Sequence, residues 1–377
     1  MSVTEMMMPS NARSRLAAAI MSTLNFASEF TDLLIHEGEP IRLKSARGVV
    51  DLPSLRLPGG DLIVESSDIK HFFTTYVEGT STAARAGSYW DTVVLPVLAN
   101  KMAVNRSMAT PAGPFLRFSL FQYNRGKLAM IVRVTNAPTP LAKVGLTEQI
   151  TERLKSDPHG LLIITGPTAS GKTSTALSIL EWMNQNRAGH ITTVEDPIEW
   201  PMKPAKCDIT QREVGFDVVS FGEGLRDAMR ISPQAILVGE VRDRDTAESA
   251  ILGGESGALM IVTTHGRSIS GTIKKMLTFT AEQSSTMREV LAGCLIGVVR
   301  QELVPRRDGT GYCMVCDTLH MTEDVRGLVE RGDWRALDKL TNQKAMPSPN
   351  FVPMSHQLEP LVRSGIVAPV ERMAVGE

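Results

Sequence analysis

The fold of this chain is decided by residues 161–173, which read LLIITGPTASGKT. Four aliphatic residues and a threonine are typical of a short buried strand, and they run directly into the pattern of glycine, four residues, glycine, lysine and threonine. Glycines at those places let consecutive backbone N–H groups turn inward around an anion, where a side chain would collide. The stretch therefore predicts a strand, a phosphate-binding loop and a helix, in that order.

The loop and the helix after it supply the groups that we expect to hold ATP and Mg²⁺. Lys172 reaches the terminal phosphates, Thr173 offers a hydroxyl to magnesium, and the helix adds free N–H groups and the positive end of its dipole. Apolar residues continue at helical spacing, so the helix should pack one face on a sheet: Ala176, Leu177, Leu180 and Met183. The predicted ATP-binding residues here are Gly166, Pro167, Thr168, Ala169, Ser170, Gly171, Lys172, Thr173 and Ser174. A glycine-rich turn without a ligand is the alternative, and the correct flanking elements disfavour it.

The composition is that of an ordinary soluble protein, and a chain of 377 residues suggests about two or three domains. Lys plus Arg number 40 against 41 Asp plus Glu, so no general basic field favours nucleic acid, and we expect no direct nucleic-acid binding. No apolar run approaches the roughly 18 residues of a membrane helix, and the N-terminus lacks a secretory pattern. Four scattered cysteines are typical of a reducing compartment. We therefore expect a cytoplasmic protein.

The N-terminal third predicts a mixed α/β domain. Short apolar runs alternate with turns over 33–53, a helix follows over 67–76, and two strands at 115–123 and 127–134 form a hairpin about Asn124-Arg125-Gly126. The segment 80–105 is ambiguous. Composition shifts predict five parts of the chain: an N-terminal extension over 1–25 with a helix capped by Ser10 or Asn11, an α/β domain over 26–136, a linker over 137–147, a core over 148–305 and a C-terminal region over 306–377.

The core continues with strands that alternate with helices, which predicts a parallel sheet. The strands are expected at 191–194, 235–238 and 259–263. Capping boxes predict two helix starts, Ser220 with Glu223 and Asp245 with Glu248.

After these strands, one long amphipathic helix is expected over 283–300, with Cys294 as a small buried residue in its apolar stripe. A strand over 312–319 and helices over 323–340 would then make a small, mostly helical C-terminal region.

Acidic residues follow two of the core strands. Glu240 is predicted to polarise the attacking water, because Gly239 stands where many P-loop proteins place a magnesium-ordering Asp. The metal must then find another acid, and Glu195 and Asp196 end a neighbouring strand at the same edge of the sheet. A merely solvated acidic loop is the alternative, and the strand-terminal position disfavours it.

A histidine follows another core strand at the same edge. His265 is placed there to hydrogen-bond or sense the γ-phosphate, and a purely structural histidine is the alternative.

Five motifs in order resemble those of the bacterial type II/IV secretion ATPase family, collinearly from about residue 146 to 301. They are Gly166–Thr173, Glu195–Glu199, Gln211–Gly215, Ile236–Glu240 with Arg242-Asp243, and Thr264-His265. The resemblance implies a PAS-like N-terminal domain that clamps nucleotide against a RecA-like P-loop NTPase core. It also implies a homohexamer at the cytoplasmic face of an inner-membrane secretion, conjugation or pilus complex. Length and the missing zinc loop look most like the pilus retraction and type IVB secretion or conjugation members.

Four arginines are candidates for contact with the nucleotide. Arg226 and Arg230 lie four residues apart on one helix and could face one phosphate, with a solvated helical face as the alternative. The resemblance suggests Arg117 and Arg133 on the last strands of the N-terminal domain, and a rim ion pair is the alternative there.

The chain departs from the family in three places. Ala169 stands where the family commonly has Gly, and Gly257-Ala258 stands where it commonly has a further His, so only His265 is carried over. One C-x-x-C pair, Cys313 and Cys316, cannot make a four-ligand site alone, and residues three apart on a strand face opposite ways, so we expect no zinc.

The predicted function is ATP hydrolysis that drives a motor. Two other functions stay open: a RecA-type nucleic-acid motor, and an ATP-gated scaffold with negligible hydrolysis.

Overall fold

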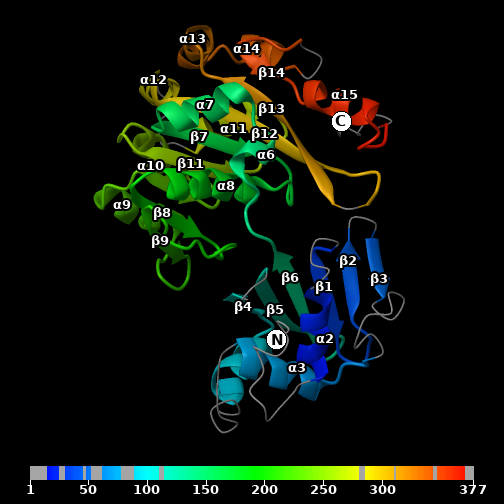
Figure 1. Cartoon of the computed structure of the whole chain (residues 1–377). Helices are drawn as coiled ribbons and strands as arrows, with labels where there is room; N and C mark the ends of the chain where they lie inside the picture. The colour runs from blue at the N-terminus through cyan, green and yellow to red at the C-terminus, as the bar shows by residue number, and fades with distance from the viewer. Residues whose placement is uncertain are drawn as a thin grey trace. The chain divides into compact units, whose positions relative to one another are not determined.

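The computed structural model describes residues 15–24, 30–45, 48–51, 62–77, 89–109, 114–279, 285–309, 311–342 and 346–369. The chain divides into two compact units, Met1–Ala137 with Gly309–Gly311, and Pro138–Asp308 with Tyr312–Glu377 (Figure 1). The proposed capping residues Ser10 and Asn11 lie outside the described residues.

The N-terminal unit is built on a six-stranded sheet in the order β3-β2-β1-β6-β5-β4, in which each neighbouring pair is antiparallel. Its strands are β1 (Asp32–His36), β2 (Arg42–Ser45), β3 (Gly48–Asp51), β4 (Val104–Ala109), β5 (Phe115–Tyr123) and β6 (Lys127–Thr135). Its helices are α2 (Arg15–Thr23), α3 (Ser66–Phe72) and α5 (Leu95–Ala99), with π-helical segments Phe73–Val77 and Trp90–Val94. Together they form the mixed α/β domain that the sequence predicts.

Alternation explains why β5 forms a strand with one buried face. Leu116, Phe118 and Leu120 are buried, and the residues between them are partly exposed. The predicted hairpin joins β5 to β6, and its turn has positive φ at Asn124 (40°), Arg125 (66°) and Gly126 (102°), the conformation that the Asn and the Gly favour.

The second unit holds an eight-stranded sheet in the order β14-β13-β12-β7-β11-β10-β8-β9. Every pairing from β12 to β9 is parallel, as the strand and helix alternation predicts, and β13 and β14 are added antiparallel. The strands are β7 (Gly160–Thr165), β8 (Gly189–Glu195), β9 (Cys207–Glu213), β10 (Ala235–Val238), β11 (Leu259–Thr264), β12 (Leu295–Pro305), β13 (Tyr312–His320) and β14 (Phe351–Val352).

Helices cover both faces of this sheet (Figure 1). One face packs on α6 (Leu141–Val144), α7 (Glu148–Ser156) and α8 (Lys172–Asn186). The other packs on α9 (Phe221–Arg230), α10 (Arg244–Gly254), α11 (Ile269–Thr278), α12 (Ser285–Cys294), α13 (Glu323–Arg331) and α14 (Trp334–Leu340). A further helix, α15, spans Ser355–Arg363. Strands β7, β10 and β11 are buried along their whole length, which is why they read as continuous apolar runs.

The long helix expected over 283–300 is wrong in its second half. Helix α12 ends at Cys294, and the chain continues directly as β12, between β7 and β13. A continuous apolar run satisfies the helical and the strand pattern alike, and here pairing on both edges selects the strand. Cys294 is buried as expected.

The predicted start of α10 is also wrong. Its N-cap is Asp243, whose carboxylate accepts from Thr246 N at 2.9 Å, and Asp245 lies inside the first turn. Asp243 and Asp245 are both favourable N-cap residues, and the structure has the earlier of the two at the N-cap position. The other predicted helix start is confirmed, since Ser220 is the N-cap of α9 and its Oγ accepts from Glu223 N at 3.2 Å.

The segment after residue 311 is part of the same sheet through β13 and β14, and the rest of it is mostly helical. Helices α13 and α14 are separated at Gly332, whose φ of 67° ends the first of them. Within the described ranges no helix is long and apolar enough to cross a membrane.

Candidate active site

The phosphate-binding loop joins β7 to α8 at the carboxyl edge of the parallel strands. Gly166 has φ of 148°, and a Cβ there would collide with the Gln301 carbonyl oxygen. Gly171 is the N-cap of α8 with φ of 82°. Ala169 also lies in the left-handed region, with φ of 61°, at the position where the family commonly has Gly. The backbone therefore keeps the glycine-like conformation at Ala169 at a cost of about 1 kcal/mol.

Gln301 on β12 supports this loop, although it is not among the predicted site residues. Its side-chain Nε2 donates to the Ser170 carbonyl at 2.6 Å, and the same side chain lies beside Gly171. Gln301 is fully buried, so the bond is shielded from water. The signal in the sequence is that Gln301 and its two charged neighbours interrupt an apolar segment, where a buried polar residue must find a partner.

Lys172, His265 and Glu240 form a continuous polar chain beside the loop. Lys172 Nζ donates to the carbonyls of Gly166 (3.2 Å) and Pro167 (2.9 Å) and lies 3.5 Å from His265 Nδ1. His265 Nε2 lies 3.3 Å from Glu240 Oε1. An ammonium only donates, so Nδ1 accepts and the ring proton belongs on Nε2, facing the carboxylate. Burial lowers the pKa of Lys172, and the nearby Glu240 and Glu199 oppose that shift.

Arg242 completes the chain, although the sequence analysis did not select it as a site residue. Its guanidinium contacts Glu240 Oε2 at 2.6 Å and Asp196 Oδ2 at 3.6 Å. The hydrogen bond to Glu240 is the main reason that the pKa of Arg242 is raised. Arg242 thus joins the ends of β10 and β8, two residues after the acid that it orients.

Glu195 occupies a different environment at the end of β8. Its side chain is 1% exposed and accepts from Thr193 Oγ1 (2.8 Å), Gln211 Nε2 (3.1 Å) and Glu199 N (3.2 Å). Burial raises its pKa to about 7, and these three hydrogen bonds oppose the shift. None of these donors carries a charge.

The residues predicted to hold magnesium fit a hard cation by their donor chemistry. Thr173 is half-buried in the first turn of α8, and Asp196 is exposed. Carboxylate and hydroxyl oxygens are the ligands that Mg²⁺ prefers. Both Glu195 oxygens already accept protein hydrogen bonds, so Glu195 is better suited to hold a metal-bound water than the ion itself.

The four candidate arginines have other partners. Arg226 pairs with Asp245 on α10, and Arg230 with Asp227 at 3.6 Å. Both are exposed on α9, and both ion pairs are with acidic residues outside the polar chain described above.

Arg117 and Arg133 lie directly opposite one another on β5 and β6, and Arg133 Nε contacts Asp32 Oδ1 at 2.8 Å. Whether any of the four arginines reaches a nucleotide stays a prediction.

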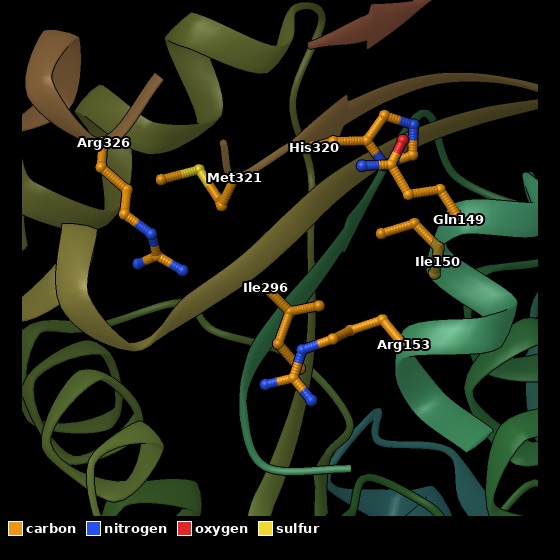
Figure 2. A pocket seen from close by; sticks show the side chains of 7 residues that line it. All are labelled: Gln149, Ile150, Arg153, Ile296, His320, Met321 and Arg326. Atoms are coloured by element: carbon orange, nitrogen blue, oxygen red, sulfur yellow. The ribbon is translucent and has the colours of Figure 1, made fainter. Parts of the chain in front are cut away.

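A cavity of about 130 Å³ lies elsewhere in this unit, and no predicted site residue lines it (Figure 2). Its lining residues are Gln149, Ile150, Arg153, Ile296, His320, Met321 and Arg326. Arg153 pairs with Asp157 at 3.0 Å, and Arg326 donates to the Gly293 carbonyl at 2.8 Å. Burial lowers the pKa of His320 to about 4, so its ring is neutral at pH 7. The cavity's cations are already engaged, and we assign it no ligand.

The two cysteines of the C-x-x-C pair differ in exposure. Cys313 is half-buried, and Cys316 is buried with its Sγ 3.4 Å from Thr318 Oγ1. Burial raises the pKa of Cys316 to about 11, which disfavours the thiolate that a metal needs. The expected absence of zinc stays a prediction.

The parallel sheet, the loop at its carboxyl edge and the polar chain beside the loop define a P-loop nucleotide-binding core. The model of the type II/IV secretion system protein family matches residues 125–348. The chain therefore belongs to that family.

Similarity extends to characterised relatives. The chain is 34% identical over 224 residues to the type IV pilus retraction ATPase PilT of Pseudomonas aeruginosa, an alignment that covers 59% of this chain and 64% of that protein. It is 30% identical over 269 residues to a twitching motility protein of Neisseria gonorrhoeae, covering 71% of each. The chain thus aligns with less than two thirds of the Pseudomonas protein.

The whole fold matches solved structures. The pilus retraction motor PilT with bound ADP superimposes with a TM-score of 0.74 at 26% identity, over 96% of this chain and 95% of that one. The ATPase DotB of Legionella pneumophila gives 0.72 at 19% identity over the same shares, which shows the fold alone.

Proposed function

We propose that this protein hydrolyses ATP and uses the turnover to drive a secretion, conjugation or type IV pilus machine. The observation that carries the proposal is the chain of Lys172, His265 and Glu240 beside the phosphate-binding loop. A cation for phosphate and a carboxylate able to orient water are groups that phosphoryl transfer to water uses, and the histidine connects the two. Relatives named as pilus ATPases support it.

Each residue of the chain has its own task. Lys172 leaves the loop carbonyls and donates to the β- and γ-phosphates, since an anion is a better acceptor than a carbonyl. Glu240 accepts a hydrogen bond from the attacking water and is held in place by Arg242. His265 lies between Lys172, on its Nδ1 side, and Glu240, on its Nε2 side, so its ring would respond when Lys172 turns to the γ-phosphate.

Magnesium, when bound with ATP, supplies charge that offsets the phosphate oxygens. Thr173 and Asp196 would hold it, with Glu195 orienting a metal-bound water. Gly239 supplies no ligand, because it has no side chain. A Cβ at that position would lie 3.3 Å from the Val194 carbonyl oxygen, so the backbone of β8 leaves little room for one.

The working form in this proposal is a homohexamer on the cytoplasmic side of an inner-membrane complex. The fold match to a pilus retraction motor supports a motor, and ATP must be within reach. A closed ring whose subunits cycle together predicts that inactive Glu240→Gln subunits, mixed with active ones, depress activity by more than their share. A strictly linear fall with the fraction of variant would show that the subunits act independently.

The test of the proposed function is phosphate release by the purified chain with Mg²⁺ and ATP. We expect steady turnover, and we expect Lys172→Ala to lose tight ATP binding because the charge facing the phosphates is gone. Lys155→Ala is the control, since it removes an exposed lysine that pairs with Glu152. ATP binding without turnover would instead favour the gated scaffold, and unchanged ATP affinity in Lys172→Ala would reject the loop assignment.

The nucleic-acid motor remains the other alternative. Turnover that rises several-fold when single- or double-stranded DNA is added would favour it, and a rate that DNA leaves unchanged would count against it.

A further inference from the structure

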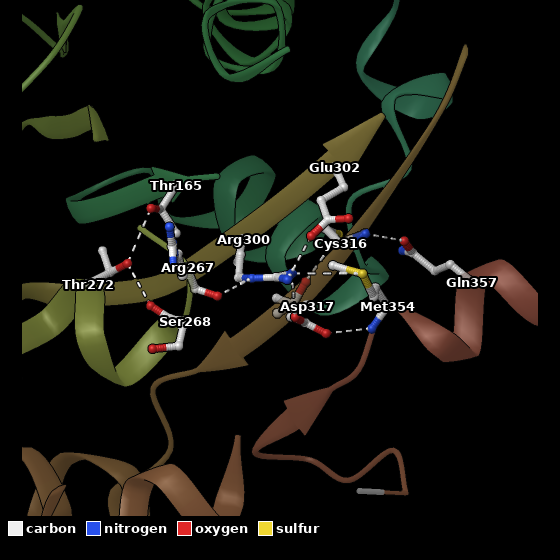
Figure 3. Close-up of polar contacts among 11 residues, drawn as sticks. Thr165, Arg267, Ser268, Thr272, Arg300, Glu302, Cys316, Asp317, Met354 and Gln357 are labelled. Carbon is white, nitrogen blue, oxygen red and sulfur yellow. Dashed lines mark hydrogen bonds and ion pairs between the residues drawn. The ribbon is translucent and has the colours of Figure 1, made fainter. Parts of the chain in front are cut away.

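Arg300 on β12 is a buried arginine whose guanidinium bonds to three parts of the chain (Figure 3). Its Nε donates to the Arg267 carbonyl at 2.8 Å, Nη1 contacts Asp317 Oδ2 at 3.0 Å, and Nη2 contacts Glu302 Oε1 at 2.7 Å. The side chain is 7% exposed. A buried cation held at three points fixes geometry, because each bond restricts the same rigid plane.

The Arg267 carbonyl belongs to the loop that carries His265. Lys275 Nζ donates to the His265 carbonyl at 3.2 Å, and Thr272 Oγ1 donates to the Ser268 carbonyl at 2.8 Å. Both donors come from α11, the helix that this loop enters. Of these three hydrogen bonds, the one from Arg300 to the Arg267 carbonyl has a donor on a strand, so it connects the loop to the sheet.

The same guanidinium connects the loop to the C-terminal segment. Asp317, which it pairs with on β13, accepts from Met354 N at 2.7 Å, and Arg300 Nη1 lies 3.8 Å from Met354 Sδ. Figure 3 shows this series of contacts running from the loop through β12 and β13 to the segment before α15. Arg300 thus connects the loop that carries His265 to the segment before α15.

We infer that Arg300 is a positioning residue for His265. By holding the Arg267 carbonyl it sets where the imidazole stands relative to Glu240 and Lys172, and a misplacement of about 1 Å at such a group costs up to about a hundredfold in rate. The catalytic part of this inference rests on the proposed ATP hydrolysis. The structural part does not.

Buried ion pairs add little net stability compared with apolar packing, because desolvation offsets their attraction. Arg300 could serve only to neutralise Asp317 and Glu302, or it could also position the loop. Its hydrogen bond to the Arg267 carbonyl is needed for the second role and not for the first. Arg300→Lys separates the two, since lysine keeps the charge near Asp317 and Glu302 but has one terminal nitrogen in place of the fork.

The first measurement reads His265 directly. The chain has seven histidines, so ¹⁵N-histidine labelling gives a small set of ring signals, and His265→Gln identifies the one that belongs to His265. In Arg300→Lys we expect that signal to move while the melting temperature stays near the wild type. Arg363→Lys is the matched control, because it alters an exposed arginine of the C-terminal region that pairs with Glu359. An unmoved His265 signal in a folded Arg300→Lys protein would overturn the inference.

The second measurement is single-turnover hydrolysis in a double-mutant cycle. We expect Arg300→Lys to lower the rate about tenfold or more with ATP affinity unchanged, and to add almost nothing in the His265→Gln background, because both act through one group. Equal effects in both backgrounds would reject the positioning role. If Arg300→Lys does not fold, Asp317→Asn replaces it, since the amide keeps an acceptor for Met354 N and weakens the hold on Arg300.

Failure of the proposed function is recognised separately. A wild type that hydrolyses no ATP refutes that function, while the His265 signal still decides whether Arg300 positions the ring.

Discussion

Glu195 is the last residue of β8 and Glu240 follows the neighbouring strand β10 by two residues, and the two acids are held in opposite ways. Glu195 is 1% exposed and accepts only from uncharged donors, so burial raises its pKa to about 7. Glu240 is 18% exposed and contacts the guanidinium of Arg242 and the ring of His265. Two carboxylates at the same edge of the sheet therefore lie in different electrostatic environments.

This difference shows that a position at the carboxyl edge of the sheet does not by itself determine the ionisation or the role of a carboxylate. A carboxylate beside a cation is stabilised in its ionised form and can orient water. In a carboxyl group that is buried among neutral donors, the ionised form is disfavoured until a cation binds nearby. Magnesium near the end of β8 would lower the pKa of Glu195, so metal binding and ionisation should be coupled there.

The largest expected effect separates the two acids by rate. Glu240→Gln keeps size and hydrogen bonding but loses the charge, and we expect hydrolysis to fall by roughly two orders of magnitude with normal ATP binding. Glu195→Gln should fall much less at saturating magnesium. Steady-state phosphate release and a binding titration check both, with the exposed Glu152→Gln as control. Equal losses in the two variants would erase the distinction.

The next effect is on stability and follows from the raised pKa of Glu195. The folded state binds the proton more tightly than the unfolded chain, so this stabilisation is complete below about pH 4.5 and is lost as the pH rises through about 7. We expect it to be worth on the order of 3 kcal/mol. Urea unfolding at about pH 5 and pH 8, without nucleotide or magnesium, should show a smaller pH difference in Glu195→Gln than in the wild type. The same difference in both proteins would mean that Glu195 titrates normally.

A smaller effect concerns magnesium itself. Glu195→Gln should move the magnesium midpoint of hydrolysis to about tenfold higher concentration, because an outer ligand of the metal is lost. The measurement is the hydrolysis rate against magnesium at fixed ATP. A lower maximal rate with an unmoved midpoint would give Glu195 some other task.

The smallest effect is expected at Arg226. Its side chain is exposed and pairs with Asp245, so Arg226→Ala should leave the free energy of unfolding almost unchanged. Any loss of hydrolysis in a fully folded variant would therefore report contact with nucleotide, as the sequence suggested. Arg244→Ala on α10, which removes a comparable exposed pair with Glu248, is the control.

The sequence predicts the site where backbone geometry or strand order dictates residue type. Gly166 and Gly171 are required by their φ angles, and His265 and Glu240 follow buried strands, so pattern alone places them at one edge. What pattern could not supply are the partners across the sheet. Thr193 and Gln211 donate hydrogen bonds to Glu195, and they lie on β8 and β9 at paired register positions that only strand pairing brings together.

Strand β12 is a second case in which the sequence pattern could not predict the structure. Its apolar run fits a helix equally well, and only the edges of β7 and β13 decide. When this segment is predicted as a helix, the roles of Arg300 and Gln301 cannot be predicted, because only on a strand do consecutive side chains point to opposite faces of a sheet.

That alternation sets a limit on how this chain can change in length. Gln301 faces the phosphate-binding loop and Arg300 the histidine loop, so consecutive residues of one strand serve opposite faces. Inserting or deleting a single residue ahead of them would exchange the two faces and bring a cation to the loop carbonyl and an amide to the acidic cluster. Related chains should therefore vary in length in the turn between β12 and β13, around Asp308 and Gly309, and keep the spacing from Leu295 to Gln301 constant.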